Sequence, residues 1–140
     1  MKMPSVNVNL VCAYSICSGH RLYRDDWSAE KNQTAFGKCT NDHGHQYTIE
    51  LHLTGPLDED TGMLINGFAV DEIVKPLIFG QLDHKFLNHD VAFFKAVQPT
   101  AEWLAYYIFR ELQAAFPTPV QLKSVRVRET AELYAEYPAA

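Results

Sequence analysis

The stretch that decides the fold is Val6-Asn7-Val8-Asn9-Leu10-Val11-Cys12-Ala13-Tyr14-Ser15-Ile16-Cys17, in which apolar side chains recur at every second position. This period of two is typical of a β-strand with one buried face, and it predicts a long strand over residues 6–17 that ends near Ser18-Gly19-His20. A second stretch, His45-Gln46-Tyr47-Thr48-Ile49-Glu50-Leu51-His52-Leu53, has the same pattern and is closed by Gly55-Pro56. The sequence therefore begins with two alternating strands.

The segment between the two strands is charged and rich in turn-forming residues. A loop is therefore predicted over residues 23–38. The aromatic side chains of Trp27 and Phe36 are expected to hold this loop in place. After the second strand, apolar residues at helical spacing predict a helix over residues 68–79. Pro76 would remove a hydrogen bond inside that helix, so a kink or an early end is expected there.

The last third of the chain predicts one more helix and one more strand. Pro99-Thr100 supplies a helix start, and apolar residues recur at helical spacing up to Pro117. Alternating valines and arginines then predict a strand over residues 122–130, followed by a further short segment. Because the first two strands follow each other without a helix, the order fits an α+β protein: one domain over residues 1–140, with an antiparallel sheet and two helices on one of its faces.

Composition argues against several classes of protein. The 140 residues are 47% apolar and carry a formal charge of −5, and no basic patch suggests a nucleic-acid partner. No apolar run approaches the roughly 18 residues of a membrane span, so no membrane is expected as a partner, and the stretch 1–5 lacks the apolar core of a signal peptide. A cytoplasmic protein is expected, in which locally placed cations meet any anionic substrate.

The cysteines Cys12, Cys17 and Cys39 form no Cys-x-x-Cys pair and argue against a disulfide framework. Cys12 and Cys17 lie among apolar residues, where thiols of the core or of a subunit contact are expected. Cys39 differs from them because it precedes the most informative motif of the chain.

The segment Cys39-Thr40-Asn41-Asp42-His43-Gly44-His45 carries the clearest chemical signal. Side chains at i and i+2 of a strand project to the same side, so His43 and His45 offer two imidazoles to one site, while Gly44 lets the backbone pass close to its neighbours. His20, at the end of the first strand, is the candidate for a third imidazole. Three imidazoles with an open fourth position are typical of catalytic zinc, although His-x-His alone is a weak signal.

Two roles stay open for Cys39. As a fourth ligand it would close the site and make the metal structural. As a free thiol beside the metal it would be a reactive group, activated by nearby positive charge such as that of Lys38.

Two further segments carry candidate residues. Asp83 and His84 are adjacent after the first predicted helix, and they form either an oriented acid–base pair or a solvated helix end. Glu129, on the last predicted strand, has a carboxylate that can accept two hydrogen bonds from an amino-pyrimidine edge. Alternatively, Glu129 is a surface residue paired with Arg128.

Six motifs occur in an order that resembles one family. They are Ser18-Gly19-His20, Cys39-x-x-x-His43-Gly44-His45-x-Tyr47, Gly62-Met63-Leu64-Ile65, Leu82-Asp83-His84-x-x-Leu87-Asn88, Pro99-Thr100-x-Glu102 and Val127-Arg128-Glu129-Thr130. Through these motifs, residues 6–137 resemble the 6-pyruvoyl tetrahydropterin synthase and 6-carboxytetrahydropterin synthase family. Each motif alone is weak, and their common order carries the resemblance.

The resemblance implies a tunnelling fold, in which the sheets of several subunits close a β-barrel. Homo-oligomers of this kind are commonly hexamers built as dimers of trimers. The resemblance also implies that His20, His43 and His45 hold zinc, Zn2+, as the cofactor.

The remaining candidates receive roles from the same resemblance. Cys39 is implied to be the base that removes a substrate proton, and Asp83 and His84 to be its relay partner, contributed by an adjacent subunit. Glu129 is implied to anchor the pterin ring, with assistance from Thr100.

The substrate implied is the small molecule 7,8-dihydroneopterin triphosphate, from which a zinc-dependent lyase eliminates triphosphate. Zinc lowers the cost of developing alkoxide or enolate charge, while Cys39 and His84 move protons on either side of the carbon skeleton. Arg21, Lys38 and Lys85 are candidate phosphate contacts by charge and position.

Two branches of the family differ in their product. One forms 6-pyruvoyl tetrahydropterin for biopterin synthesis, whereas the other also loses acetaldehyde and forms 6-carboxytetrahydropterin, a precursor of queuosine. The short spacing between Cys39 and His43 resembles the carboxy branch, and the long segment from His20 to Cys39 resembles the pyruvoyl branch. The carboxy product is predicted, with the pyruvoyl product as the alternative.

The chain departs from the family at the turn into the first predicted helix. Many members have Asp-Phe where this chain has Asn66-Gly67, and a Lys is often found in place of Asp71. Local structural variation that leaves the catalytic residues intact is expected. Two other functions stay open: another tunnelling-fold enzyme acting on dihydroneopterin, such as an epimerase or aldolase, and a non-catalytic pterin-binding module stabilised by zinc, with Cys39 as fourth ligand.

Overall fold

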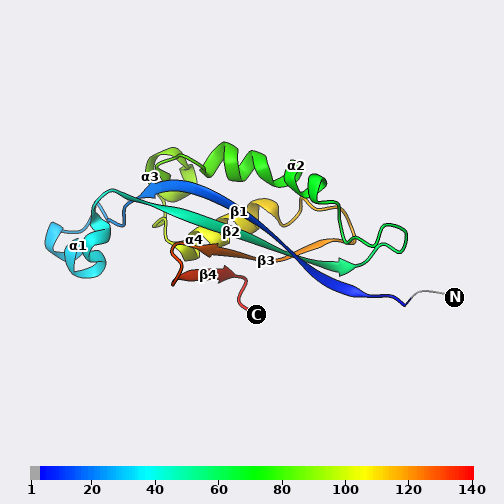
Figure 1. Cartoon of the computed structure of the whole chain (residues 1–140). Coiled ribbons are helices and arrows are strands. Elements are labelled where there is room, and N and C mark those ends of the chain that lie inside the picture. The colour runs from blue at the N-terminus through cyan, green and yellow to red at the C-terminus, as the bar shows by residue number, and fades with distance from the viewer. Residues whose placement is uncertain (1–3) are drawn as a thin grey trace.

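The computed structural model describes residues 4–140, so the prediction about the stretch 1–5 falls partly outside the described residues. The described chain forms one four-stranded antiparallel sheet in the order β1-β2-β3-β4 (Figure 1). The strands are β1 (Asn7–His20), β2 (His43–Pro56), β3 (Gln121–Arg128) and β4 (Tyr134–Tyr137). The last of these is the short segment that the sequence places after the final predicted strand.

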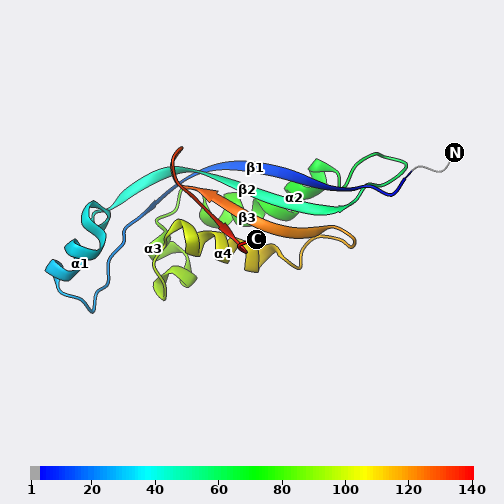
Figure 2. The same ribbon diagram turned by 90° about the horizontal axis from the view of Figure 1, so that it is seen from below.

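Helices cover one face of the sheet. The helical elements are α1 (Ala29–Phe36), η1 (Gly37–Thr40), α2 (Gly67–Leu77), η2 (Ile78–Leu82), α3 (Leu87–Asp90), η3 (Ala92–Lys95) and α4 (Ala101–Leu112). The two longest, α2 and α4, lie on the same side of the strands, and α1 extends from one end of the molecule (Figure 2). The α+β prediction of an antiparallel sheet with two helices on one face is confirmed. Within residues 4–140, no helix combines the length and apolar character needed to cross a membrane.

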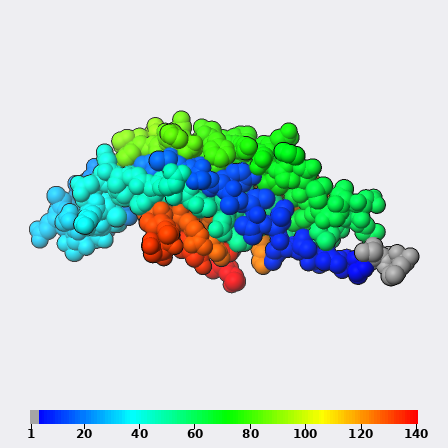
Figure 3. Space-filling view, in the orientation of Figure 1, coloured from blue at the N-terminus to red at the C-terminus, as the bar shows by residue number. Residues whose placement is uncertain are grey.

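The core lies between this face of the sheet and the helices. Alternate residues of the strands, such as Ile49, Leu51 and Val125, are fully buried, because the period-2 pattern directs them toward α2 and α4. Burying this apolar surface is the main favourable contribution to folding. On the opposite side the strands are open, and Figure 3 shows β1 at the surface beside the helical layer.

The pairing of β1 with β2 runs without interruption along both strands, from Asn7 opposite Pro56 to His20 opposite His43. A shift of one residue would turn every buried side chain outward, so the hydrophobic pattern fixes this register. The two histidines therefore end up as direct cross-strand neighbours on the helix-covered face.

The loop predicted over residues 23–38 is wrong in its second half, which forms α1. The Ser28 side chain caps this helix by accepting a hydrogen bond from the Lys31 N–H at 3.1 Å. The side chain of Asn32, only 1% exposed, donates to the Arg24 carbonyl at 2.9 Å and accepts from the Arg24 N–H at 2.7 Å. These polar contacts stabilise the helix without an apolar stripe, which is why hydrophobic periodicity does not reveal it.

The two aromatic residues expected to hold this segment in place contact each other within it. The rings of Trp27 and Phe36 stack with centroids 5.8 Å apart and planes inclined by 15°. This contact joins the segment before α1 to the end of the helix.

The early helix end expected at Pro76 is also confirmed. α2 stops at Leu77, and η2 continues as a π-helical turn in which the Asp83 N–H donates to the Ile78 carbonyl at 3.0 Å. Two other boundaries differ from prediction: α4 ends at Leu112 rather than near Pro117, and β3 ends at Arg128.

The three cysteines are free thiols, as expected. Cys12 is partly buried and packs against the core, whereas Cys17 is exposed on the open side of the sheet. The prediction of a core thiol therefore holds in part for Cys12 and is wrong for Cys17. The alternative expectation, a subunit contact, remains a prediction for Cys17.

The two-faced sheet predicts different costs for one substitution at two positions. Val125 is fully buried and Val11 is 48% exposed on the same sheet. Val125→Ala is expected to lower the free energy of unfolding by about 2 kcal/mol, because it removes two buried methyl groups and leaves a cavity. Val11→Ala is expected to change it by no more than about 0.5 kcal/mol. Urea unfolding followed by circular dichroism measures both, and equal losses would contradict the assignment of the faces.

Candidate metal-binding site

Four side chains converge at the end of the sheet: those of His20, His43, His45 and Glu129, each offering an atom within 4.8 Å of the other three. Nε2 of His20 lies 3.0 Å from Nε2 of His43 and 3.8 Å from Oε1 of Glu129. Nε2 of His45 lies 2.7 Å from the same carboxylate oxygen. Ligands around one tetrahedral zinc ion are separated by about 3.3 Å. The spacings of the four atoms bracket that value.

The strands place the three imidazoles. His20 and His43 face each other at the end of the β1–β2 pairing, and His45 follows two residues later on the same face of β2. Gly44 between them lies against β1, where an added Cβ would be only 3.2 Å from the Ser18 carbonyl oxygen. A larger residue at this position would push the strands apart, so the expected close approach at Gly44 is confirmed.

Glu129 reaches the same site from β3. In this strand Val125 and Val127 point into the core, and Glu129 continues their parity one residue past the strand end. A turn holds it there, because the Glu129 N–H donates to the Leu133 carbonyl at 3.0 Å. The alternative in which Glu129 pairs at the surface with Arg128 is wrong, since Arg128 bonds to Glu50 instead.

The hydrogen bonds of two rings determine their tautomers. Nδ1 of His20 lies 2.7 Å from the Pro99 carbonyl oxygen, and Nδ1 of His43 lies 2.7 Å from the Asn41 carbonyl oxygen. A carbonyl oxygen can only accept, so both Nδ1 atoms carry the proton and both neutral rings present an unprotonated Nε2. Carbonyl partners of this kind orient metal-binding histidines.

Protonation of His20 does not relieve the repulsion among the acceptor atoms of this site. Two unprotonated Nε2 atoms face each other at 3.0 Å beside an acceptor-only carboxylate. Burial lowers the pKa of His20 to about 4, so this ring stays neutral near pH 7. A divalent cation placed among the four atoms would satisfy all of them. The donor set therefore fits a metal ion such as zinc.

Cys39 lies in η1, four residues before His43. Its carbonyl oxygen accepts a hydrogen bond of 2.7 Å from the N–H of Leu22, which joins η1 to the segment that follows His20. The thiol is partly buried. Among the described residues it is Glu129, and not Cys39, that completes the group of four converging side chains.

The Asp83–His84 pair exists but faces outward. Nδ1 of His84 lies 3.0 Å from Oδ2 of Asp83, and the His84 side chain is 81% exposed. A hydrogen bond from the Cys17 N–H, 2.9 Å long, lowers the pKa of Asp83 and keeps it ionised. His84 has a positive φ of 59°, and its N–H donates to the Cys17 carbonyl at 2.6 Å. The two side chains therefore contact each other at the solvent-exposed end of η2, and their use as an acid–base pair stays a prediction.

Thr100 occupies a position beside the histidine group. Its hydroxyl accepts a hydrogen bond of 3.2 Å from the Trp103 N–H and caps α4. The preceding residue, Pro99, provides the carbonyl that orients His20. The same helix start therefore positions both Thr100 and the candidate ligand His20.

The three candidate phosphate contacts do not share one hollow. Arg21 lines a hollow of about 790 Å³ together with Lys95 and His89, and its guanidinium stacks on Tyr23 at 4.0 Å. Within residues 4–140, the buried Nε of Arg21 has no hydrogen-bond partner. Lys85 lines a separate, shallower hollow with His84 and Gly44. Lys38 is exposed on η1.

Two amide side chains hold the backbone that leaves His20, a role that sequence reasoning missed. Asn88 accepts from the Arg21 N–H at 2.9 Å and donates to the Arg21 carbonyl at 2.9 Å. Gln98 does the same for Tyr23, at 3.0 and 3.1 Å. Each side-chain amide makes the two hydrogen bonds that the backbone of a neighbouring strand would otherwise make. The one sequence signal for this role is that both residues carry a side-chain amide and lie in or beside the motifs at 87–88 and 99–100.

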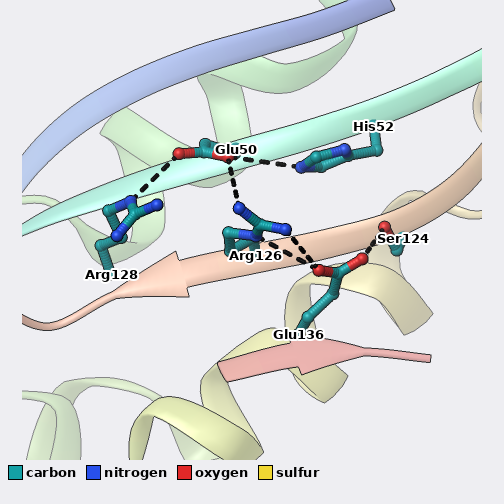
Figure 4. Close-up of polar contacts among 6 residues, drawn as sticks. All are labelled: Glu50, His52, Ser124, Arg126, Arg128 and Glu136. Atoms are coloured by element: carbon teal, nitrogen blue, oxygen red, sulfur yellow. Dashed lines mark hydrogen bonds and ion pairs between the residues drawn. The ribbon is translucent and has the colours of Figure 1, made fainter. Parts of the chain in front are cut away.

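A network of charged residues, shown in Figure 4, lies on the open face of the sheet, opposite to the face that carries His20, His43 and His45. Glu50 contacts Arg126, Arg128 and His52, while Glu136 contacts Arg126 and Ser124. Two guanidinium groups therefore face two carboxylates. Since these charges balance, the network has no excess charge with which to attract an ionic ligand.

The fold and site together define a class: α+β proteins with a candidate metal site, made of histidines and a carboxylate, at the end of an antiparallel sheet. Comparison with known proteins narrows this class. A family model described as 6-pyruvoyl tetrahydropterin synthase matches residues 10–140. The chain belongs to this family of tetrahydropterin synthases, which are lyases that act on small pterin substrates.

Individual relatives agree with the family match. The chain is 40% identical over 118 residues to the 6-pyruvoyl tetrahydrobiopterin synthase of Homo sapiens, covering 83% of this chain and 81% of that protein. It is 36% identical over 110 residues to the 6-carboxy-5,6,7,8-tetrahydropterin synthase of Bacillus subtilis, covering 72% and 70%. The solved structure of Caenorhabditis elegans 6-pyruvoyl tetrahydropterin synthase matches with a TM-score of 0.84 and 31% identity, covering 100% and 99%.

Removing one of the two amide clamps is expected to weaken the protein. Asn88→Ala leaves the N–H and C=O of Arg21 without their partner, which is expected to lower the free energy of unfolding by about 1–2 kcal/mol. Gln81→Ala is the matched control, since Gln81 is exposed on η2. Urea midpoints of the two variants provide the measurement. A midpoint for Asn88→Ala equal to that of the control would mean that the clamp contributes nothing.

Proposed function

We propose that the chain is a zinc-dependent lyase that eliminates triphosphate from 7,8-dihydroneopterin triphosphate, with the metal held by His20, His43 and His45. The observation that carries this proposal is the 3.0 Å approach of two unprotonated imidazole nitrogens, with a third imidazole beside them. Such a cluster of neutral imidazoles fits a divalent cation. Family membership supports the class of substrate.

The proposed reaction requires proton transfer on both sides of the reacting carbon atoms. When bound, zinc polarises the hydroxyl groups of the substrate side chain. Cys39 removes a proton from that side chain. His84, oriented by ionised Asp83, exchanges a proton on the other side, so that triphosphate leaves as the carbon skeleton rearranges. Glu129 accepts two hydrogen bonds from the amino-pyrimidine edge of the ring, assisted by Thr100.

The outward orientation of Asp83 and His84 supports their use by a neighbouring subunit. In a single chain the His84 side chain is 81% exposed, although its partner Asp83 is held firmly on β1. At this surface position the pair is accessible to a site brought by a second chain. This agrees with a homo-oligomer in which sheets of several subunits close a barrel, and we propose a hexamer built as a dimer of trimers.

Two observations favour different products. The three residues between Cys39 and His43 give the thiol a short tether to the metal ligands, which supports 6-carboxytetrahydropterin and hence a place in queuosine synthesis. The second candidate product is 6-pyruvoyl tetrahydropterin, used for tetrahydrobiopterin. It is favoured by the 40% identity with the human protein, against 36% with the Bacillus subtilis protein. We place the carboxy product first, because the short spacing between Cys39 and His43 is a feature of the site itself.

Product analysis tests the proposal directly. Zinc-loaded protein is expected to convert 7,8-dihydroneopterin triphosphate to 6-carboxytetrahydropterin with release of acetaldehyde, as followed by mass spectrometry. A pyruvoyl product without acetaldehyde would establish the second candidate. Substrate returned unchanged by metal-replete, assembled protein would contradict the lyase and favour a pterin-binding module.

Substitution of the proposed base separates catalysis from metal binding. Cys39→Ala is expected to reduce turnover by at least about 100-fold, because the proton is no longer removed by a positioned group. The variant is expected to retain one zinc per chain, since the imidazoles remain. Cys17→Ser, at the exposed thiol, is the control and is expected to keep both activity and metal. Loss of zinc from Cys39→Ala would show instead that the thiol is a ligand.

A further inference from the structure

We propose that the hollow beside the end of β1 binds an oligophosphate, that is, a short chain of linked phosphate groups. This anion hollow has a volume of about 790 Å³. One of its walls comes from residues 21–26, which follow β1, and the other from residues 88–103, between α3 and the first turn of α4. The four side chains of the candidate metal site do not line it.

The first support is the state of the Arg21 guanidinium in this hollow. Its Nε is buried and has no hydrogen-bond partner among residues 4–140. The centroid of the Tyr23 ring lies 4.0 Å from the guanidinium carbon, a cation–π contact that leaves this N–H unsatisfied. A buried donor without a partner is costly, and the edge of a guanidinium matches two oxygens of one phosphate. An anion that draws this edge toward the hollow would satisfy the donor.

The second support is the charge of the lining. Its cations are Arg21, Arg24 and Lys95, and its acidic residues are Asp25 and Asp26, so the hollow carries one net positive charge in a chain of −5. Arg24 and Asp26 neutralise each other through two contacts of 2.9 and 2.7 Å. The ion pairs among residues 4–140 involve neither Arg21 nor Lys95. By contrast, carboxylates neutralise the arginines on the open face of the sheet (Figure 4).

The third support is that the two walls are joined to each other. Asn88 and Gln98 belong to one wall, and their amides hold the backbone of Arg21 and Tyr23 in the other wall. Four hydrogen bonds of 2.9 to 3.1 Å therefore fix the separation of the walls. A preformed site of this kind loses little conformational entropy when a ligand binds.

The size of the hollow and the placement of its donors indicate the class of ligand. About 790 Å³ lies within the range of small-molecule sites, roughly 300–1,000 Å³, and exceeds what one phosphate group needs. Arg21 stands on one wall, whereas Lys95 and the exposed His89 stand on the other. Donors on both walls suit an anion with several phosphate groups, each of which presents its own oxygens.

Two sources can supply such an anion. One is the triphosphate of 7,8-dihydroneopterin triphosphate, and this source rests on the proposed function. The other is a free inorganic oligophosphate, which needs no lyase activity. Both present the same chemistry to Arg21 and Lys95.

Calorimetric titration of the zinc-loaded protein with inorganic tripolyphosphate tests the site without turnover. Arg21→Gln is expected to weaken binding by about tenfold, because it removes the guanidinium edge. Lys95→Glu, at an exposed position that is expected to fold normally, should weaken it by at least about fivefold. Lys123→Glu makes the same charge change at an exposed position of β3 and is expected to match the wild type.

Tripolyphosphate also binds metal ions, so the result is the difference between variants of equal zinc content. Affinities of Arg21→Gln and Lys95→Glu equal to that of the wild type would overturn the anion hollow. The same holds if Lys123→Glu weakens binding as much as Lys95→Glu does, because the effect would then come from net charge alone.

Steady-state kinetics distinguish the two sources. If the hollow holds the triphosphate of the substrate, Lys95→Glu raises the KM for 7,8-dihydroneopterin triphosphate by the factor seen with tripolyphosphate, at unchanged kcat. An unchanged KM together with weakened tripolyphosphate binding assigns the hollow to a free oligophosphate. Because the titration involves no catalysis, a protein that fails as a lyase can still confirm the anion hollow, and an active lyase can still refute it.

Discussion

The uninterrupted pairing of β1 with β2 is the constraint on which the rest of the structure depends. It places His20 opposite His43, and with them two unprotonated nitrogens that repel each other unless a cation lies nearby. Hydrophobic burial fixes the register, since a slip by one residue would expose the core side of both strands. The free energy gained by burying the core therefore offsets the repulsion between the two imidazole nitrogens at the strand ends.

Other segments support these strand ends by hydrogen bonds rather than by apolar packing. Pro99, at the start of α4, orients His20, and Asn41, just before β2, orients His43. The amides of Asn88 and Gln98 hold the backbone that leaves β1. Because these contacts come from distant parts of the chain, the geometry of the site depends on the complete fold and not on one motif.

The sequence predicts the fold well where one pattern dominates. Period-2 alternation identifies β1 and β2, places the three histidines at strand ends, and leads to the α+β class. It fails for α1, which is stabilised by the Ser28 cap and the buried Asn32 rather than by an apolar stripe. The boundaries of α4 and β3 are also inexact, because turns and not hydrophobicity end these elements.

The site is only partly predictable for a related reason. His43 and His45 share a face by local geometry, but the orientation of Asp83 depends on the π-helical turn η2 and on the Cys17 backbone. The convergence of Glu129 with the histidines depends on how β3 packs beside β2. Its parity with Val125 and Val127 was nevertheless visible in the sequence, and it indicates an inward carboxylate.

The position of Glu129 also bears on how a chain of negative net charge handles an anionic substrate. With a formal charge of −5, the protein as a whole does not attract a triphosphate. The open face of the sheet adds no attraction, because its arginines are neutralised by Glu50 and Glu136. Under the proposed function, local cations such as Arg21 and Lys85 meet the triphosphate, while the carboxylate of Glu129 meets the neutral ring.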